Sequence, residues 1–180
     1  MIIWLNGTFG AGKTSAATEL AGILPDARQF DPEWVGYMLK ANLADLDFTD
    51  FQQLPSWRTL VPVVMAEVAA LTGQHLIAVQ TVLVESYWRE LLAGLRERRL
   101  DVLHVLLHAD PAVLEQRIRA DQVEREACQW RLDHLTEFAA ARPWLEASAD
   151  VIVDSTQLSA AEVARAVAAA AAPLMNASAA

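Results

Sequence analysis

A glycine-rich segment near the start of the chain constrains the fold more than any other feature. Its residues are, in order, Gly7, Thr8, Phe9, Gly10, Ala11, Gly12, Lys13 and Thr14. They match the pattern G-x-x-x-x-G-K-[ST] and lie between an apolar run at residues 1–5 and a helix-prone run at residues 15–24. In this strand, loop and helix context the pattern indicates a phosphate-binding loop rather than a chance turn.

Each residue type in this loop has a physical reason. Glycine lets the backbone approach a phosphate closely, and successive N–H groups then form an anion-binding nest. The helix that begins near Lys13 adds the positive end of its dipole. The Lys13 ammonium is placed to reach the β- and γ-phosphates of a nucleotide, and the Thr14 hydroxyl can ligate Mg²⁺. We therefore expect ATP and Mg²⁺ as cofactors, with nucleotide contacts that extend from the loop to Ser15.

Length, charge and cysteine content exclude several classes of protein. The chain has 180 residues, which suits one domain, and its net charge of −9 argues against a sequence-independent nucleic-acid surface. Its single cysteine, Cys128, excludes an internal disulfide and a zinc cluster, and it suits the reducing cytoplasm. No basic segment precedes the first apolar run, and no apolar run reaches about 18 residues, so we expect neither a signal peptide nor a membrane span.

Apolar runs and helical patterns alternate along the whole chain. We expect strands at residues 1–5, 28–30, 75–79, 101–108 and 150–153. We expect helices at residues 15–24, 33–42, 56–71, 86–99, 111–119, 132–142 and 159–172, with Pro143 interrupting the sixth. This alternation predicts a single α/β domain over residues 1–180, with a five-stranded parallel sheet and helices on both faces. The last helix is alanine-rich with one basic residue, so we expect it to pack on the sheet and not on a membrane.

Ligands of parallel sheets bind at the carboxyl ends of the strands. This rule brings four loops together, namely the phosphate-binding loop, the loop with Asp31, the Gln80–Thr81 pair and residues 154–156. No aspartate ends the strand at 75–79, where many P-loop enzymes have a second magnesium carboxylate. We therefore expect metal binding to depend on Thr14, the phosphates, water and Asp31.

Further segments occur in the order in which one known family has them. They are Phe30-Asp31-Pro32-Glu33 with Gly36, then Phe51-Gln52, then Pro55-x-Trp57-Arg58. With the opening segment, they resemble the tunicamycin resistance protein family, ATP-binding P-loop proteins of bacteria. The resemblance covers most of the chain and is densest over residues 1–60. A wider similarity is to small-molecule and nucleoside monophosphate kinases, which implies a P-loop NTPase three-layer sandwich with a short arginine-containing lid, here about residues 118–130.

The resemblance gives Asp31 the central chemical role. In related small kinases an aspartate after the second strand faces the acceptor hydroxyl and the Mg²⁺ shell, where its carboxylate can accept the hydroxyl proton. Asp31 also precedes Pro32, an arrangement that caps a helix, and the two roles could compete for the same oxygens. Lys13, Asp31 and Arg117 are the catalytic residues that we expect, and Thr14 and Asp31 are the expected metal ligands.

The acceptor is expected to lie between the helices at 33–42 and 56–71. Arg58 can hold a phosphate or carboxylate by two parallel bonds, and Trp57 can stack on a base or sugar. The alternatives are an ion pair for Arg58 and a core position for Trp57. Gln80 is either an acceptor contact or an ordinary strand-end residue.

Arginines bracket the charged segment that resembles a lid. The resemblance places Arg117 on the adenine side, where Thr156 lies in a similar loop, and makes Arg125 and Arg131 weaker candidates for substrate contacts. A lid arginine can stabilise charge on the transferring phosphoryl group when the lid closes. Salt bridges on a solvated helix are the alternative for each of them.

These expectations combine into an ATP-dependent phosphotransferase, a cytoplasmic P-loop kinase that acts on an alcohol group of a small molecule. The resemblance implies that the acceptor is tunicamycin or a nucleotide-sugar-like molecule, and that phosphorylation confers antibiotic resistance. The alternative is an ATP-binding protein that sequesters tunicamycin without chemistry. A third hypothesis, an ATPase switch, is weakened by the missing carboxylate. We expect no nucleic-acid partner and no membrane contact, and the sequence leaves the oligomeric state open.

Overall fold

A computed structural model describes residues 1–123 and 125–178 of the chain. The strands are β1 Ile2–Gly7, β2 Ala27–Phe30, β3 His75–Val79, β4 Val102–His108 and β5 Val151–Asp154. The α-helices are α1 Lys13–Ile23, α2 Glu33–Asn42, α3 Pro55–Thr72, α4 Glu85–Glu97, α5 Pro111–Ala120, α6 Cys128–Ser148 and α7 Ala160–Ser178. Two short 3₁₀ helices, η1 Phe51–Gln53 and η2 Arg125–Ala127, precede α3 and α6.

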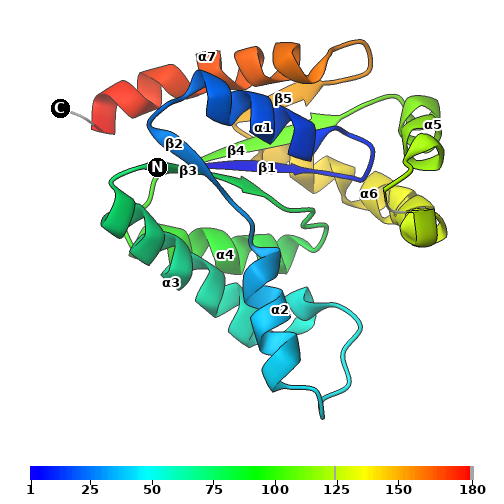
Figure 1. Ribbon diagram of the computed structural model, residues 1–180, viewed down its shortest axis with the longest axis horizontal. Coiled ribbons are helices and arrows are strands. Elements are labelled where there is room, and N and C mark those ends of the chain that lie inside the picture. Colours follow the sequence, from blue (N-terminus) through cyan, green and yellow to red (C-terminus); the bar gives the residue numbers. More distant parts are fainter. Residues whose placement is uncertain (124, 179–180) are drawn as a thin grey trace.

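The strands of the described residues form one parallel sheet in the order β2-β3-β1-β4-β5. Strand β1 lies at its centre, where Ile3 pairs with Ile77 of β3 and Leu103 of β4. Helices cover both faces of the sheet, with α1 and α7 on one side and α3 and α4 on the other (Figure 1). The predicted α/β sandwich with a parallel sheet is therefore confirmed.

The alternation of side chains along β1 supplies both halves of the core. Ile3 and Leu5 pack with the buried faces of α1 and α7, whereas Ile2 and Trp4 pack with those of α3 and α4. A strand that is buried on both faces has no polar side, which explains why residues 2–5 read as one continuous apolar run. This burial fixes the end of β1, and hence the loop that follows it.

Two helices extend past a proline near which the sequence predicted an interruption or an end. Helix α6 continues through Pro143 to Ser148 instead of stopping there. Pro143 removes a hydrogen bond to the carbonyl of Ala139, but both residues are exposed, so water can satisfy that carbonyl. Buried Ala141 and Leu145 hold the helix on either side of the proline. Helix α7 likewise runs through Pro173 to Ser178, beyond the predicted end at residue 172.

Helix α7 packs against the sheet, as its composition predicted. Its side chains Val163, Ala164, Val167 and Ala171 are buried in the same cluster as Ile3 and Leu5 of β1. Within the described residues, no helix combines the length and the apolar character that crossing a bilayer requires.

Candidate active site

The glycine-rich loop joins β1 to α1 at the carboxyl edge of the sheet. A side chain on Gly7 would place its Cβ 2.1 Å from the carbonyl oxygen of Leu107, and Gly7 has a φ of +137°. A Cβ on Gly10 would lie 2.9 Å from the Leu114 carbonyl oxygen, again with positive φ. The close approach of β4 and α5 therefore requires glycine at these positions. Glycine also lets the backbone approach a phosphate closely.

Lys13, the first residue of α1, is buried beneath this loop. Its Nζ donates hydrogen bonds to the carbonyl oxygens of Gly7 at 3.0 Å and Thr8 at 2.9 Å. The pKa of Lys13 is lowered from 10.5 to about 7, first by burial and then by the charge of Arg131, while the charge of Glu33 acts in the opposite direction. Thr14 and Ser15 follow on the first turn with exposed side chains. A buried ammonium at the amino end of a helix is a strong local site for phosphate.

Arg117 of α5 connects the glycine-rich loop to the loop after β5. Its guanidinium donates to the carbonyl oxygens of Gly10 at 3.2 Å, Ser155 at 2.9 Å and Thr156 at 3.4 Å. Ser155 donates in turn to the carbonyl oxygen of Ala11 at 2.9 Å. These bonds hold two loops that are about 145 residues apart in the sequence as one unit.

A hollow of about 220 Å³ lies beside this unit, lined by Gly12, Ser15 and Arg117 and, on its apolar side, by Leu158, Ala160 and Val163. It adjoins the glycine-rich loop on the side expected for the adenine. Thr156 does not line it: its hydroxyl accepts from the N–H of Asp110 at 2.8 Å and donates to the Asp154 carboxylate. Thr156 therefore holds the loop after β5 in shape, and its contact with a nucleotide stays a prediction.

Asp31 lies at the carboxyl end of β2 and is exposed. Its Oδ1 accepts a hydrogen bond from the backbone N–H of Glu33 at 2.9 Å, so Asp31 does cap the start of α2. A carboxylate has further lone pairs, so capping leaves it able to face a ligand. The catalytic and metal-binding roles of Asp31 remain predictions.

Trp57 and Arg58, predicted to contact the acceptor, are both engaged within the protein. Trp57 is fully buried, and its Nε1 donates to the carbonyl oxygen of Pro32 at 3.1 Å. Arg58 is buried against the Tyr87 ring, donates to the Gln52 carbonyl oxygen, and forms a 2.7 Å ion pair with Glu90. The core and ion-pair alternatives describe these residues, because neither presents a free surface to a ligand.

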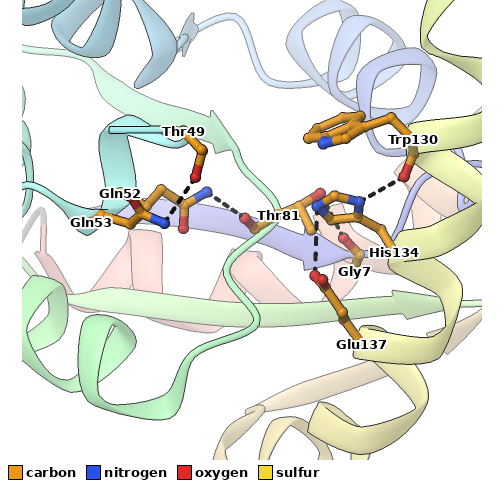
Figure 2. A network of polar contacts seen from close by, with 8 residues as sticks. All are labelled: Gly7, Thr49, Gln52, Gln53, Thr81, Trp130, His134 and Glu137. Carbon is orange, nitrogen blue, oxygen red and sulfur yellow. Dashed lines mark hydrogen bonds and ion pairs between the residues drawn. The ribbon is translucent and has the colours of Figure 1, made fainter. Parts of the chain in front are cut away.

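The end of β3 has a role that sequence reasoning missed (Figure 2). Thr81 donates from its hydroxyl to the Gly7 carbonyl oxygen at 2.9 Å, and its own carbonyl accepts from Gln52 Nε2 at 2.9 Å. The segment before α3 is thus linked through Thr81 to the start of the glycine-rich loop. Gln80 is buried at the end of β3, and its backbone N–H bonds to the Leu5 carbonyl oxygen. The only sequence signal for Thr81 was its place after a buried strand.

Asn6 provides a second link that the sequence did not reveal. Its Oδ1 accepts from the backbone N–H groups of Gly7 at 2.8 Å and Val82 at 3.0 Å, and its Nδ2 donates to the Val82 carbonyl oxygen. Asn6 also lies 3.4 Å from Nε2 of His104, whose burial lowers its pKa. These bonds fix the two strand ends that flank the phosphate site.

The start of α6 covers the glycine-rich loop from the other side. Phe9 packs against the rings of Trp130 and His134, at centroid distances of 5.0 Å and 5.5 Å. Figure 2 shows His134 with its contacts to the Trp130 carbonyl and to Glu137. The Arg131 guanidinium lies 5.3 Å from the centre of the Phe9 ring. Arg131 is therefore nearer the phosphate site than its weak sequence ranking indicated.

The two arginines that the sequence ranked as weaker candidates, Arg131 and Arg125, are arranged differently. Arg131 pairs with Asp121 at 2.7 Å, which joins the end of α5 to the start of α6. Arg125 lies in η2 with an exposed side chain, away from these contacts. Among the described residues, no group of three or more His, Cys, Asp or Glu side chains could hold a metal ion by itself. The exposed Thr14 hydroxyl and Asp31 carboxylate fit a Mg²⁺ that is bound mainly through phosphates and water.

Comparison with known proteins supports the fold described above. A family model described as an AAA domain matches residues 2–140. The solved structure of the tunicamycin resistance protein of Deinococcus radiodurans is similar with a TM-score of 0.72 at 28% sequence identity, over 95% of both chains. No curated protein sequence matches the chain at a significant level. The resemblance that the sequence indicated is thus confirmed at the level of structure.

Two kinases share the fold at lower identity. A sugar kinase from Janibacter sp. HTCC2649 has a TM-score of 0.64 at 16% identity, over 93% of this chain and 92% of its own. The shikimate kinase of Acinetobacter baumannii, solved with shikimate, has a TM-score of 0.59 at 19% identity, over 97% of this chain and 93% of its own. These likenesses confirm the P-loop kinase-like fold.

Proposed function

The chain belongs to the AAA domain family, and we propose that it is an ATP-dependent phosphotransferase acting on an alcohol group of a small molecule. One observation carries the proposal. The buried Lys13 lies at the head of α1, after the central strand β1, whereas Asp31 follows the edge strand β2 and Arg117 holds the loop after the opposite edge strand β5. We assign the nucleotide to the Arg117 side and the acceptor to the Asp31 side. A site divided in this way suits transfer of a phosphoryl group from one ligand to another.

Named side chains would share the work of this reaction. Lys13 and the loop N–H groups would hold the β- and γ-phosphates, and Thr14 would ligate Mg²⁺. When bound, Mg²⁺ would neutralise charge on the phosphate oxygens. Asp31 would accept the proton of the acceptor hydroxyl. The oxygen of that hydroxyl would bond to the γ-phosphorus as the bond between the γ-phosphorus and the bridging oxygen breaks and ADP leaves. Arg131, beside Phe9, would stabilise charge on the transferring group.

We infer that the acceptor is tunicamycin or a nucleotide-sugar-like molecule, and that the reaction takes place in the cytoplasm, where ATP is available. The printed name of one structural relative, a tunicamycin resistance protein, supports tunicamycin as the first compound to test. Phosphorylation of a hydroxyl on the compound would spoil its fit to its target.

Sequestration without chemistry is the second candidate, and the capping bond of Asp31 favours it. If Asp31 serves only to cap α2, the protein has no general base and binds the compound without turnover. The Asp31→Asn variant separates the two functions, because asparagine keeps a capping oxygen but cannot take up the proton. Under the transfer proposal, this variant binds ATP with unchanged affinity and loses at least about 100-fold in ADP formation.

The experiment incubates the protein with MgATP and tunicamycin, then measures ADP and the mass of the compound. A mass gain of one phosphate supports transfer. The matched control is Asp50→Asn, because Asp50 caps η1 through the same kind of bond, in which its Oδ1 accepts from the Gln52 N–H at 2.8 Å. Stoichiometric binding with no ADP, equal in the wild type and the Asp31 variant, would instead establish sequestration.

A further inference from the structure

Four aromatic rings form a continuous row on the acceptor side of the molecule. Trp34 contacts Tyr37 at a centroid distance of 5.8 Å, Tyr37 contacts Phe51 at 6.4 Å, and Phe51 contacts Trp57 at 5.3 Å. The inner end of the row, Trp57, is fully buried, whereas the outer end, Trp34, is 71% exposed. The row therefore runs from the core to the surface of α2.

The middle of this row is packed tightly against α2. Gly36 of α2 has no side chain, and a Cβ there would lie 2.5 Å from the Phe51 ring. Phe51 can therefore pack directly on the backbone of α2, beneath Tyr37. The bond from Trp57 Nε1 to the Pro32 carbonyl fixes the first turn of the helix. Phe51 and Tyr37 therefore form a packed base beside which the exposed Trp34 ring lies.

The outer face of α2 is unusually apolar for a surface helix. Tyr37 and Met38 are each 49% exposed, beside the more exposed Trp34. In Figure 1, α2 extends beyond the layered part of the molecule, at the bottom of the view. A contiguous exposed group of large apolar side chains indicates a binding surface, whereas a single one needs no explanation.

This face adjoins the site of the proposed transfer. Trp34 lies in the first turn of α2, directly after Glu33, whose backbone N–H is bound by Asp31. Glu33 also accepts a hydrogen bond from the Tyr37 hydroxyl at 3.0 Å, and its charge acts on Lys13. One end of the aromatic face is thus beside Asp31 and Glu33.

We propose that the face of α2 formed by Trp34, Tyr37 and Met38 binds the ring-bearing part of the acceptor, a sugar or nucleobase with apolar substituents, while the acceptor hydroxyl lies near Asp31. This inference rests on the proposed phosphotransferase function. An exposed indole offers a flat apolar surface on which either kind of ring stacks. The proposal thus gives Trp34 the stacking role that the sequence indicated for Trp57.

A membrane surface is the other occupant that exposed aromatic residues would suit, and charge argues against it. The chain carries a net charge of −9, and the acidic residues of α2 and the segment after it, Glu33, Asp45 and Asp47, outnumber the one lysine of α2, Lys40. Anionic lipid surfaces attract cationic segments, so they would repel this one. The ligand that fits the face is a small molecule with ring and apolar character.

The test measures tunicamycin binding by calorimetry for the wild type, Trp34→Ala, Trp34→Phe and Leu71→Ala. Leu71 is 84% exposed on α3 and serves as the control for loss of an exposed apolar side chain. We expect Trp34→Ala to weaken binding at least about tenfold, which corresponds to about 1.4 kcal/mol. Trp34→Phe should retain most of the affinity, Leu71→Ala should equal the wild type, and ATP affinity should be unchanged throughout.

Three results would overturn the inference. They are equal tunicamycin affinity for the wild type and Trp34→Ala, no tunicamycin binding by the wild type, and binding to phosphatidylcholine vesicles that depends on Trp34 while tunicamycin affinity does not. ADP formation by the wild type, measured in parallel, tests the proposed function separately. If ADP forms but Trp34→Ala has no effect on binding, the phosphotransferase proposal stands and the assigned face does not. Met38→Ala provides a second variant with a smaller expected loss.

Discussion

The Lys13 ammonium lies 3.0 Å from the carbonyl oxygen of Gly7, within the loop that it is expected to serve. Lys13 must leave this carbonyl to reach a phosphate, and because its pKa is about 7 it must also be protonated to do so. At pH 8 to 9 we therefore expect ATP binding to take up close to one proton. Calorimetry in buffers of different ionisation enthalpy measures that uptake, and Lys13→Met should abolish it together with most of the affinity.

The same pKa makes a prediction for stability. Between about pH 7 and pH 10.5 the unfolded chain holds a proton on Lys13 that the folded chain does not. The free energy of unfolding of the wild type should therefore rise with pH across this window relative to that of Lys13→Met. Urea titrations of both proteins at several pH values measure the difference. Parallel pH profiles would show that Lys13 stays charged in the folded protein.

Arg117 should be needed for nucleotide binding because it holds both loops beside the hollow. Arg117→Ala is expected to weaken ATP binding by about 10- to 100-fold, from the loss of charged hydrogen bonds worth about 1.5–3 kcal/mol. Arg119→Ala, two residues away, removes only an exposed pair with Glu115 and should leave affinity unchanged. Calorimetry with MgATP makes the comparison, and equal losses in both variants would contradict this role.

Thr81 and Lys13 share the Gly7 carbonyl as acceptor. Once Lys13 turns to a phosphate, Thr81 is left to hold that carbonyl, so Thr81→Val should weaken ATP binding by about fivefold, or ~1 kcal/mol. Thr81→Ser keeps the hydroxyl and should restore the affinity. Thr59→Val removes an exposed hydroxyl that donates to its own helix, and it should have no effect. Failure of the serine variant to restore binding would count against the hydrogen bond.

Arg58 should matter for stability and not for acceptor choice. Arg58→Ala leaves the Gln52 carbonyl without its donor and Glu90 without its partner, so we expect a loss of about 2 kcal/mol in the free energy of unfolding. Arg89→Ala, which breaks an exposed pair with Glu85, should lose under about 0.5 kcal/mol. Urea denaturation measures both. A fully stable Arg58 variant with weaker acceptor binding would restore the original prediction for this residue.

The sequence predicted helices and strands correctly where neighbouring residues decide the structure. It did not predict contacts between residues that are far apart in the chain. Residues 2–5 and the Asp110-Pro111 cap predict a strand and a helix start because short-range sterics and hydrogen bonds decide them. Trp34 and Trp57 look alike in the sequence, since each follows a proline near a helix start. Only the packing of α2 and α3 on each other decides that one is exposed and the other is buried.

The arginines show the same limit. Arg58 pairs with Glu90, 32 residues further along the chain, and no periodic pattern within one helix could indicate that pair. Arg131 reaches Phe9 only because α6 returns across the glycine-rich loop after α5. Its contact with the phosphate site is a property of topology, and this explains why its position in the charged segment gave so weak a signal.

The bonds from Arg117 to the loops after β1 and β5 also fix the end of α5, from which the chain continues towards α6. Any movement of α6 relative to the sheet would begin after α5 and would leave the hollow beside Arg117 unchanged in shape. The rate of such a movement and the shape of the hollow would then depend on different residues.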